Sequence, residues 1–364
     1  MIFSLPTVLA SWHRPRLAAA ATVICTTLTL AFTLSATAAE HGVILQYHHI
    51  SNSTPPSTST TPEAFRSHLE YLRDNGFTVM PLDTLLSSLR NQQPVPDKAV
   101  AITFDDGYIS IYSEAFPTLQ SFGFPFTVFI STQPIDDNQQ GFMTWDQIRE
   151  MSNAGVLFAN HMVHHPYMLD RLPGETDTDW LERQRQELLA AEERIRVNTG
   201  QSLKYLAYPY GEFDTAIKAM LAQEGFVGIA QNSGAIGFHS DFLALPRYPL
   251  GGSFADLESA RVKFDSLSFN VSELDPENPV TDSASPGARV RFEPGEYNFS
   301  QIGCFANSKP IPMRWIEGEP GLVELTPEES YSGRRFRYIC TAPQPGSRRY
   351  FWYSLQWINP AIRE

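Results

Sequence analysis

Short apolar runs alternate with helical patterns from about residue 42 to residue 250. Turn-forming or charged residues bound the runs, which is typical of buried strands. Strands that alternate with helices predict an α/β fold, built on either a parallel sheet or a barrel. We expect eight strands, at Val43–Gln46, Phe77–Met80, Val100–Phe104, Phe126–Ile130, Val156–Ala159, Tyr205–Tyr208, Phe226–Ala230 and Leu243–Leu250.

Helical signals fill two of the longer intervals between these runs. Thr61 followed by Pro62 is a helix start, an N-cap before a proline at the first helical position, and Gly76 ends that helix. Residues 179–198 carry apolar side chains at helical spacing with charges between them, which predicts a surface helix. In such folds functional groups gather where strands end, so residues directly after an apolar run are candidates for chemistry.

The pattern changes after residue 253. Residues 254–286 are rich in Ser, Asp, Glu and Pro, which predicts a linker. Residues 287–364 contain short strand-like runs separated by turns, which predicts a small all-β, sandwich-like domain. The expected organisation is an α/β domain over residues 40–253, the linker, and a β-rich accessory domain.

The first 38 residues have the three parts of a secretory signal. Arg14 and Arg16 precede an apolar stretch over residues 17–34, and the small residues Ala36 to Ala38 follow it. We expect cleavage near Ala38 and export to the periplasm or the outside of the cell. The apolar stretch is also about as long as a membrane span, so an uncleaved N-terminal anchor is the alternative.

The cysteines also bear on whether the chain is exported. One of the three cysteines, Cys25, lies in the apolar N-terminal stretch. Cys304 and Cys340 then form an even pair, which predicts one disulfide in an exported chain. Two reduced, buried thiols are the alternative.

The charge balance limits the possible partners. The 364 residues carry 27 Lys and Arg against 40 Asp and Glu, a formal net charge of −13. This acidity excludes the basic footprint of a nucleic-acid-binding protein. We therefore expect no nucleic-acid partner, and membrane association only through an uncleaved N-terminal segment.

Two adjacent carboxylates follow the predicted strand Val100–Phe104. Asp105 and Asp106 come directly after it, and Gly107 follows them. At a strand end both side chains can turn into one site, where one carboxylate holds a metal ion and the other acts as a base. A helix cap or an ordinary turn is the alternative for these three residues alone.

Histidines gather after the predicted strand Val156–Ala159. His161 and His165 are four residues apart, so a helical turn would present both to one metal ion. Two histidines and one carboxylate leave a coordination position open for water, which is the arrangement of a catalytic zinc site. The sequence therefore predicts a divalent metal, with zinc (Zn2+) as the expected ion.

Two further strand ends supply weaker candidates. His48 follows the first run, and a histidine titrates near neutral pH and suits a general acid, although it is as often structural. Tyr208 to Gly211 follow another run, and the bend at Pro209 can hold a backbone N–H toward a developing oxyanion. On its own this bend is only a turn.

Together these segments resemble the polysaccharide deacetylases of carbohydrate esterase family four. The motif from Thr103 to Gly107 and the His-x-x-x-His-Pro motif that begins at His161 carry the resemblance, which covers roughly residues 42–250. The resemblance implies a distorted (β/α) barrel. It also implies hydrolysis of N-acetyl groups from a polysaccharide that contains N-acetylglucosamine, with release of acetate.

The resemblance implies a role for each candidate. Asp105 is the expected catalytic base. Asp106, His161 and His165 are the expected metal ligands. Tyr210 is expected to donate its backbone N–H to the oxyanion.

Three departures from the family pattern place the chain more narrowly. Met162 stands where the family usually has Ser or Thr, and Ala207 stands where it usually has an arginine. The Leu-x-His segment expected near the end of the domain is absent. The chain instead begins the domain with Tyr47-His48-His49 and ends it with Leu245-Pro246-Arg247-Tyr248.

This arrangement is similar to a permuted branch of exported poly-β-1,6-N-acetylglucosamine deacetylases. The branch implies His48 as the general acid. Arg247 is either the substitute for the missing arginine that orients the base or a surface ion pair. Trp145 matches a segment common in this branch and either walls the sugar pocket or belongs to the core, while Tyr208 is a second candidate for substrate contact.

Two other functions remain open. Peptidoglycan or chitin oligomers could replace poly-β-1,6-N-acetylglucosamine as the N-acetylated polysaccharide partner. A sugar-binding relative with a decayed site is the alternative class, in which Trp315, Trp352 and Trp357 would stack on sugars instead of forming a sandwich core. No catalytic candidate lies beyond Arg247, so we expect that reducing the disulfide loosens the β-rich domain but leaves deacetylation largely intact. The role of that domain is left open. The oligomeric state is left open.

Overall fold

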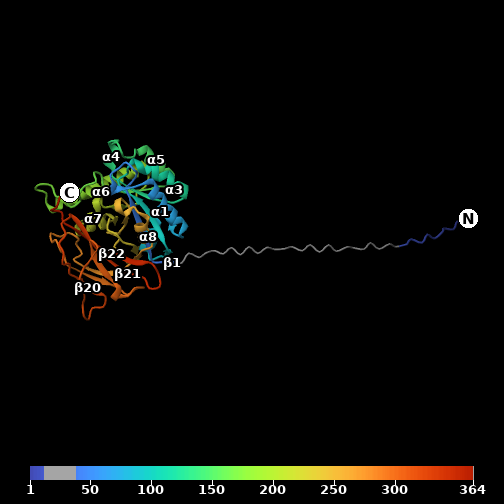
Figure 1. Cartoon of the computed structure of the whole chain (residues 1–364). Helices are drawn as coiled ribbons and strands as arrows, with labels where there is room; N and C mark the ends of the chain where they lie inside the picture. The colour runs from blue at the N-terminus through green and yellow to red at the C-terminus, as the bar shows by residue number, and fades with distance from the viewer. Residues whose placement is uncertain (12–37, 364) are drawn as a thin grey trace. The chain divides into compact units, whose positions relative to one another are not determined.

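The computed structural model describes residues 1–11 and 38–363 (Figure 1). Residues 36–364 form one compact unit. Most of the predicted signal segment, residues 12–37, lies outside the described residues. No helix within the described part of the chain is long and apolar enough to cross a membrane.

A curled sheet of nine strands forms the centre of the α/β part. Its strands are β2 (His41–Tyr47), β5 (Thr78–Val79), β7 (Ala99–Phe104), β8 (Thr127–Ile130), β9 (Leu157–Asn160), β10 (Tyr205–Ala207), β11 (Val227–Ile229), β12 (Ile236–Gly237) and β13 (Tyr248–Pro249). The main path runs β11-β10-β9-β8-β7-β2-β12, with β13 paired to β2 and β5 paired to β7. All neighbours from β11 to β2 are parallel, which confirms the predicted α/β fold.

The last predicted strand, Leu243–Leu250, is mostly irregular, because its two prolines cannot donate to a ladder. Its first half pairs with β11, where the Leu245 N–H donates to Gly228 and Ala230 donates to the Leu245 carbonyl. Its second half contains β13 and lies along β2, with the Leu250 N–H donating to the Gln46 carbonyl. The segment therefore spans the interval between β11 and β2 and completes the distorted barrel.

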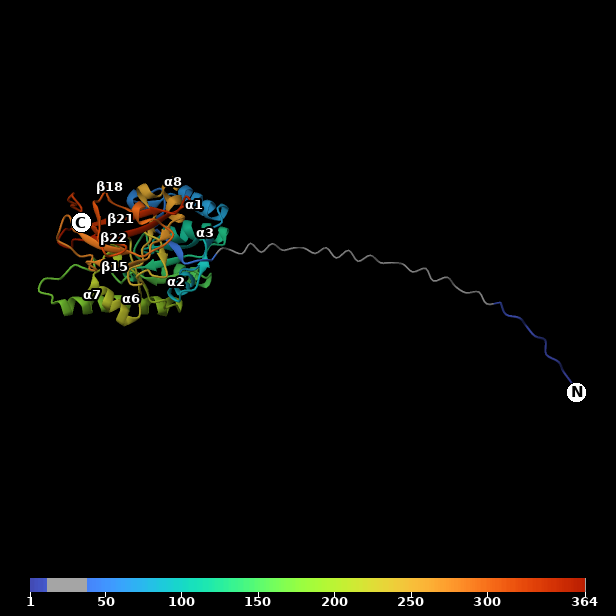
Figure 2. The ribbon, with the colours of Figure 1, turned by 90° about the horizontal axis from the view of Figure 1, so that it is seen from below.

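Helices connect these strands, and Figure 2 shows α1 near α8 and α6 near α7. The Thr61 hydroxyl accepts from the Ala64 N–H at the start of α1, as its sequence predicts. The predicted surface helix is α6, which Thr176 caps at its N-terminus. The bounds are α1 (Pro62–Asp74), α2 (Leu82–Arg90), α3 (Phe116–Phe122), α4 (Thr132–Asp136), α5 (Trp145–Asn153), α6 (Asp177–Thr199), α7 (Thr215–Glu224) and α8 (Leu257–Phe264).

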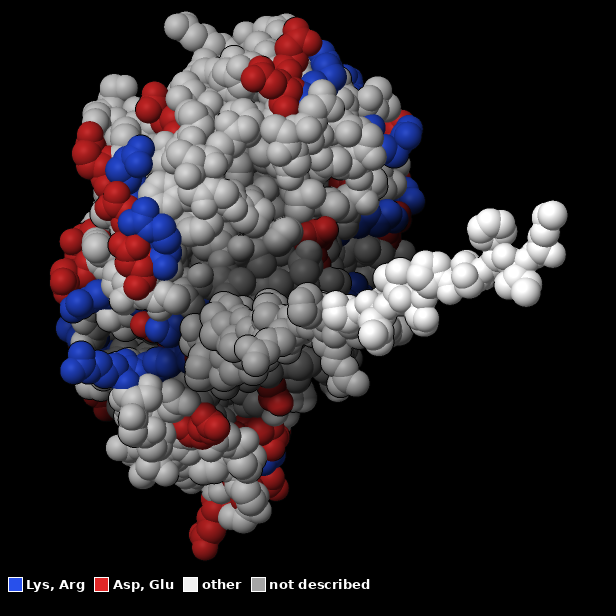
Figure 3. Space-filling view, turned by 90° about the vertical axis from the view of Figure 1, so that its right-hand side faces the viewer, with Lys and Arg blue, Asp and Glu red and all other residues white. Residues whose placement is uncertain are grey.

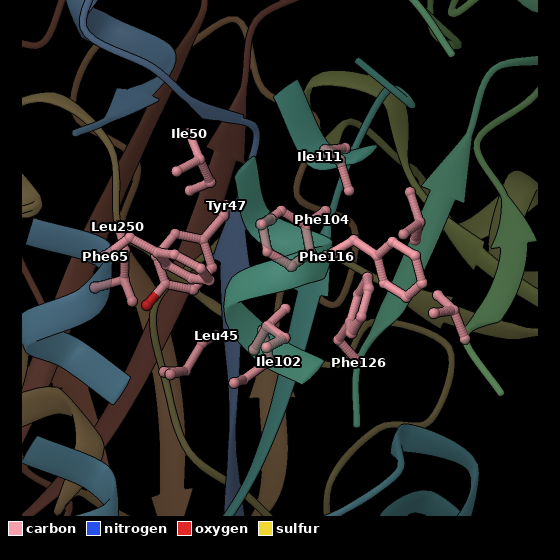
Figure 4. Packing of buried hydrophobic residues seen from close by; sticks show 14 of the residues in the cluster. Leu45, Tyr47, Ile50, Phe65, Ile102, Phe104, Ile111, Phe116, Phe126 and Leu250 are labelled. Atoms are coloured by element: carbon pink, nitrogen blue, oxygen red, sulfur yellow. The ribbon is translucent and has the colours of Figure 1, made fainter. Parts of the chain in front are cut away.

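Aromatic side chains secure the ends of β2 and β7 in the core (Figure 4). The Tyr47 ring lies 5.0 Å from the Phe65 ring of α1 and 5.4 Å from the Phe104 ring. The Phe104 ring lies 5.6 Å from that of Phe126. Burial of one such side chain contributes about 1.5–3 kcal/mol, so both strands are held firmly at the points where His48 and Asp105 follow.

The C-terminal part consists of two sheets that share one core. One sheet has the order β14-β22-β21-β17-β18 and the other β15-β16-β20-β19. A disulfide joins Cys304 to Cys340 within the first sheet, which confirms the predicted pairing. The bounds are β14 (Leu267–Ser268), β15 (Val271–Asp275), β16 (Ala288–Phe292), β17 (Gly303–Ala306), β18 (Lys309–Pro310), β19 (Met313–Trp315), β20 (Leu322–Leu325), β21 (Arg335–Pro343) and β22 (Tyr350–Ile358).

The structure corrects the linker expected over residues 254–286. Asp256 caps α8, and Ala260 and Phe264 of this helix are buried in the same core as β2 and β7. Farther along, β14 pairs with β22 and β15 pairs with β16. The polar composition belongs to the exposed sides of these short elements, so the chain passes into the β-rich part without a free linker.

Charged side chains of both signs lie interspersed on the face shown in Figure 3. Elsewhere along the described chain, exposed ion pairs include Arg73 with Asp74 and Arg196 with Glu193. Pairs of this kind contribute little to stability, because water and salt screen them. The visible face therefore lacks the continuous basic field of a nucleic-acid-binding surface.

Candidate active site

Asp105 and Asp106 leave the end of β7 in different directions. The Asp105 N–H donates to the Tyr47 carbonyl at 3.0 Å, which continues the pairing with β2 by one residue. Asp106 then adopts a left-handed conformation, with φ 72°, and Gly107 follows with φ 86°. This sharp turn brings both carboxylates to the same end of the barrel.

The Asp106 carboxylate meets two histidines from the loop after β9. Asp106 Oδ1 lies 3.2 Å from His161 Nε2 and 3.4 Å from His165 Nε2. The structure thus brings together the three residues expected to bind metal, with one atom of each within 4.8 Å of the others. The loop is not the helical turn that the four-residue spacing suggests, because Met162 and His165 are left-handed, with φ 67° and 53°.

Both histidines present Nε2 to the Asp106 carboxylate, but only His165 has a lowered pKa: burial lowers the pKa of His161, while the Asp106 and Asp105 carboxylates raise it above its usual value. His161 is fully buried, and its Nδ1 lies 2.7 Å from the Ala207 carbonyl, to which it donates, so in the neutral ring Nε2 carries the lone pair. That Nε2 has no hydrogen-bond partner, although a carboxylate oxygen lies beside it. Burial and the nearby His161 lower the pKa of His165 to about 4, which keeps that ring neutral. A divalent cation fits this donor set, because it would satisfy the unpartnered Nε2 and the carboxylate together.

Asp105 is fully buried and forms a two-pronged ion pair with Arg247. Arg247 Nη1 donates to Oδ1 at 2.7 Å and Nη2 donates to Oδ2 at 2.8 Å, while Gln46 Nε2 donates to Oδ2 at 2.7 Å. Burial alone would raise the pKa of Asp105, but the Arg247 charge lowers it below its usual value. A carboxylate has about four lone-pair positions, and these contacts occupy three, so Oδ1 keeps one for a proton.

Arg247 reaches Asp105 because it lies in the segment that closes the barrel. Its Nε donates to the Ala230 carbonyl at 3.0 Å and its Nη1 donates to the Thr103 hydroxyl at 3.2 Å. Its guanidinium lies over the Phe129 ring, 5.4 Å from the ring centre. Neither side chain of the Arg247–Asp105 pair is exposed, which excludes the alternative of a surface ion pair.

His48 follows β2 directly and is half-buried. Burial raises the pKa of Asp106, but the neighbouring His161, His48 and His165 together lower it below its usual range. His48 is also among the groups that lower the pKa of Asp105, after Arg247 and His161. His48 therefore lies near both carboxylates. His49 stacks on Tyr108, with 3.7 Å between the ring centres.

Tyr210 lies in a short turn after β10, at Pro209–Gly211, and is left-handed with φ 57°. Its ring lies 4.5 Å from the His165 ring and stacks on Tyr167 at 3.9 Å. Gly211 has φ 73°, and a Cβ there would lie 2.8 Å from Cβ of Gln231, so only glycine fits.

Backbone strain is concentrated around this group of residues. Asp106, Met162, His165 and Tyr210 are four of the ten non-glycine residues with positive φ in the described chain. Such conformations cost about 1–3 kcal/mol each and persist only where the surroundings hold them. The site is therefore pre-shaped at the expense of local stability.

The region that carries this geometry matches a family model described as polysaccharide deacetylase. The match spans residues 92–229, which include both carboxylates, both metal-site histidines and Tyr210. Over these residues the chain matches a polysaccharide deacetylase domain. His48 and Arg247 lie outside the matched range, as expected if the ends of the domain are rearranged.

Named relatives of the deacetylase domain agree with the family. YxkH of Bacillus subtilis (strain 168), named after the same family, is 28% identical over 207 residues, which cover 56% of this chain and 69% of the relative. The poly-beta-1,6-N-acetyl-D-glucosamine N-deacetylase of Escherichia coli (strain K12) is 26% identical over 206 residues, 47% of this chain and 30% of that protein. This chain therefore aligns with less than a third of the E. coli relative.

Solved structures share the fold of the deacetylase domain. IcaB from Ammonifex degensii has a TM-score of 0.55 at 21% identity and covers 63% of this chain and 98% of its own. The Streptococcus pyogenes deacetylase PplD in complex with acetate has a TM-score of 0.55 at 23% identity and covers 62% and 98%. The α/β fold expected from the sequence is thus confirmed as a deacetylase fold.

Two predicted substrate contacts of the deacetylase domain take other positions. Tyr208 is fully buried and its hydroxyl donates to the Leu243 carbonyl at 2.7 Å, so we reassign it from substrate contact to packing. Trp145 begins α5 after a Thr144 capping box, its Nε1 donates to Asp136 at 2.9 Å, and its ring packs against the core. These contacts favour the core alternative for Trp145.

Sequence reasoning missed several residues around the site. Gln46 binds Asp105 from β2, and its signal was a polar residue inside a buried strand, in register with Thr103. Glu212 and Arg334 have no such signal, because these two partners are 122 residues apart along the chain. The third histidine of the cluster, His164, is exposed and pairs with Glu187 instead of joining the metal site.

Proposed function

We propose that the protein hydrolyses N-acetyl groups of a polysaccharide that contains N-acetylglucosamine, in a metal-dependent reaction that releases acetate. A polymer like poly-β-1,6-N-acetylglucosamine is the favoured substrate, since several relatives carry its name. One observation carries the proposal. A buried carboxylate, Asp105, is kept ionised by Arg247 directly beside a triad of metal-binding residues.

Asp106, His161 and His165 would hold a divalent metal, with zinc as the expected ion, because three such ligands leave room for water and substrate. Bound there, the metal supplies Lewis acidity, which lowers the pKa of water and polarises the acetamide carbonyl. The neutral state of His165 and the free Nε2 of His161 support this assignment.

Asp105 is proposed to take the proton from the attacking water as general base. Its lowered pKa keeps it ionised at neutral pH, and one lone pair of Oδ1 remains free to accept. Arg247 and Gln46 fix the plane of the carboxylate, so the accepting oxygen has one orientation. Tyr210 is proposed to donate its backbone N–H to the oxyanion as charge develops there.

His48 is proposed to protonate the nitrogen of the leaving glucosamine unit. Its position after β2 and its electrostatic influence on both carboxylates support this role. A general acid is needed because an amine leaves readily only after it has gained a proton.

A cavity of about 530 Å³ beside the site supports a sugar polymer as substrate. It is lined by the ring pair His49 and Tyr108 and by neutral hydroxyl and amide side chains, including Asn52, Ser110 and Gln140. Sugar rings bind such surfaces through apolar contact with rings and hydrogen bonds to hydroxyls. An exported location is proposed as well, because disulfides such as Cys304–Cys340 persist in oxidising compartments.

The test is acetate release by the zinc-loaded protein from poly-β-1,6-N-acetylglucosamine oligomers, chitin oligomers and peptidoglycan. We expect the first to react fastest, and Asp105→Asn to retain zinc while losing most turnover, because an amide cannot accept the proton. Acetate release from none of the three, with zinc bound, would contradict the proposal. Faster acetate release from chitin oligomers or peptidoglycan would change the assigned substrate, while the proposed deacetylation reaction would stand.

A further inference from the structure

Two strands of the C-terminal part reach the loops of the active site. β21 begins at Arg335, and Arg334 precedes it. Gln356 of β22 donates from Nε2 to the Gly211 carbonyl at 2.6 Å, directly after Tyr210. No catalytic candidate was expected beyond Arg247, but residues beyond it do contact the loops of the site.

Arg334 connects the two loops that carry His165 and Tyr210. Its Nε and Nη2 donate to the two oxygens of Glu212, at 2.6 and 2.7 Å, and Glu212 lies two residues after Tyr210. Its Nη2 also donates to Asp170 at 2.6 Å, and Asp170 lies five residues after His165 in the loop between β9 and α6. One guanidinium thus binds both loops.

The Arg334 side chain is fixed by a complete set of contacts. Its Nη1 donates to the Pro360 and Ile362 carbonyls, at 3.1 and 3.0 Å, so all five N–H groups have acceptors. Arg334 is 1% exposed and Glu212 is fully buried. A buried pair with two parallel hydrogen bonds has a single geometry. It therefore fixes where the loop of Glu212 lies, in addition to neutralising its charge.

Aromatic rings continue the connection to the metal site. The Arg334 guanidinium lies 4.6 Å from the Tyr167 ring, and Tyr167 stacks on Tyr210 with an angle of only 3° between the planes. Tyr210 in turn packs against the ring of His165. Arg335 also binds Glu212, at 2.7 Å, and lies over the Tyr210 ring.

We propose that Arg334 is a positioning residue of the deacetylase, which fixes the loop of His165 relative to the loop of Tyr210. The inference rests on the proposed function, since it assigns Arg334 to the same site. His165 and Tyr210 both have left-handed backbones that only their surroundings hold in place. The β-rich part supplies those surroundings and is therefore a component of the active site rather than an accessory domain.

The experiment uses the full-length, zinc-loaded protein with Arg334→Gln and Asp170→Asn. We measure zinc affinity by competition with a chelator, together with kcat and KM for acetate release. Loss of a residue that orients metal ligands typically costs about 10–100-fold in metal affinity or activity, and we expect Arg334→Gln in that range, with the loss in kcat rather than KM. Asp170→Asn should also lower zinc affinity and kcat, but by a smaller factor than Arg334→Gln.

Asp170→Asn protects the test against simple unfolding. The Asp170 side chain is half-exposed, so this variant is expected to fold even where Arg334→Gln does not. The matched control is Arg291→Gln in β16, because Arg291 also binds two carboxylates and a carbonyl, those of Glu273, Glu319 and Pro320. Its variant should keep the zinc affinity and kcat of the unaltered protein.

The possible outcomes separate this inference from the proposed function. Zinc affinity and kcat unchanged in Asp170→Asn and in any folded Arg334→Gln would overturn the positioning role. Equal losses in Arg291→Gln would overturn it too, because the effect would then be general destabilisation. If the unaltered protein releases no acetate but the variants still weaken zinc binding, the positioning role stands and the proposed substrate fails.

Discussion

The two sides of the active site are held in place by different parts of the chain. We call Asp105, Asp106, His161 and Arg247 the floor, and His165, Tyr167, Tyr210 and Glu212 the wall. Every floor residue is buried and tied to neighbouring strands of one barrel. The wall consists of three partly exposed rings and the buried Glu212 carboxylate, to which Arg334 of the C-terminal part donates. The chemistry is therefore specified inside one domain, but its geometry is completed from outside that domain.

The largest expected effect tests the floor. Replacing His161 with alanine should abolish zinc binding and acetate release, because it removes one of the three proposed ligands. The metal content of the purified protein, measured by mass spectrometry, checks this directly. His164→Ala is the matched control, since His164 is exposed and pairs with Glu187, and it should retain zinc and activity. If the His161→Ala variant retains zinc, the metal does not bind at Asp106, His161 and His165.

His48 tests whether the floor extends to β2. A general acid contributes about 10²–10⁴-fold, so His48→Ala should lower kcat by that order with zinc still bound. The loss should shrink for an activated ester, whose leaving group needs little protonation. His49→Ala should raise KM more than it lowers kcat, because His49 stacks on Tyr108 at the cavity. If His49→Ala instead lowers kcat strongly and His48→Ala mainly raises KM, then His49 is the general acid and His48 contacts the substrate.

The disulfide tests how far the wall depends on the β-rich part. Cys304 and Cys340 pair within the sheet that carries Arg335. Replacing both with serine should lower the free energy of unfolding by about 2–4 kcal/mol, measured in urea. We also expect a modest loss of kcat, smaller than that of Arg334→Gln, since β21 loosens without losing its contacts. Full activity in the loosened protein would show that the wall needs only local contacts.

The smallest effect concerns pH and the support behind the floor. His68 is fully buried, its Nδ1 contacts the Tyr47 hydroxyl, and burial lowers its pKa to about 4. The unfolded chain binds this proton below pH 6.5 and the folded chain only near 4, so the stability contribution is complete above pH 6.5 and is lost as pH falls toward 4. The change is on the order of 1–3 kcal/mol.

Thermal unfolding of His68→Gln across pH 4 to 7 checks this sign. The variant should show a shallower fall in Tm toward acid than the unaltered protein. Other buried histidines keep their contribution in both proteins, so the difference isolates His68. A steeper fall in the variant would mean that His68 is protonated in the folded state.

His165 and Tyr210 of the wall were predicted from the sequence together with the floor, but the contacts that hold the wall, made by Tyr167, Glu212 and Arg334, were not, for a physical reason. Asp105, Asp106 and His161 each follow an apolar strand, and parallel strands bring their ends together at one edge of a sheet. Local order along the chain is enough to place them. The pairing of Arg334 with Glu212 joins positions that are 122 residues apart and that lie beside two different sheets. No local sequence pattern predicts such a contact.

The same contrast explains the errors. Leu243–Leu250 was expected as a strand from its apolar character, but its role is to cross from β11 to β2, and this irregular path is what buries Arg247. Tyr208 was expected at the substrate because it follows a strand, yet the strand end turns it into the core. Residues 254–286 were expected as a linker because composition cannot report which short segments find partners.

The closure of the barrel by its last segment sets an order of events during synthesis. Asp105 leaves the ribosome 142 residues ahead of Arg247, and Thr60 is made 190 residues before its acceptor at Leu250. Until then Leu45 and Gln46 of β2 have no partner on their β13 side, and the Asp105 carboxylate is without its counter-charge. Arg334 arrives still later. A nascent chain therefore emerges with its proposed metal ligands made but with the proposed active site unassembled, and late, long-range contacts of this kind slow folding. We therefore expect no deacetylation before Arg247 and Arg334 have both been made.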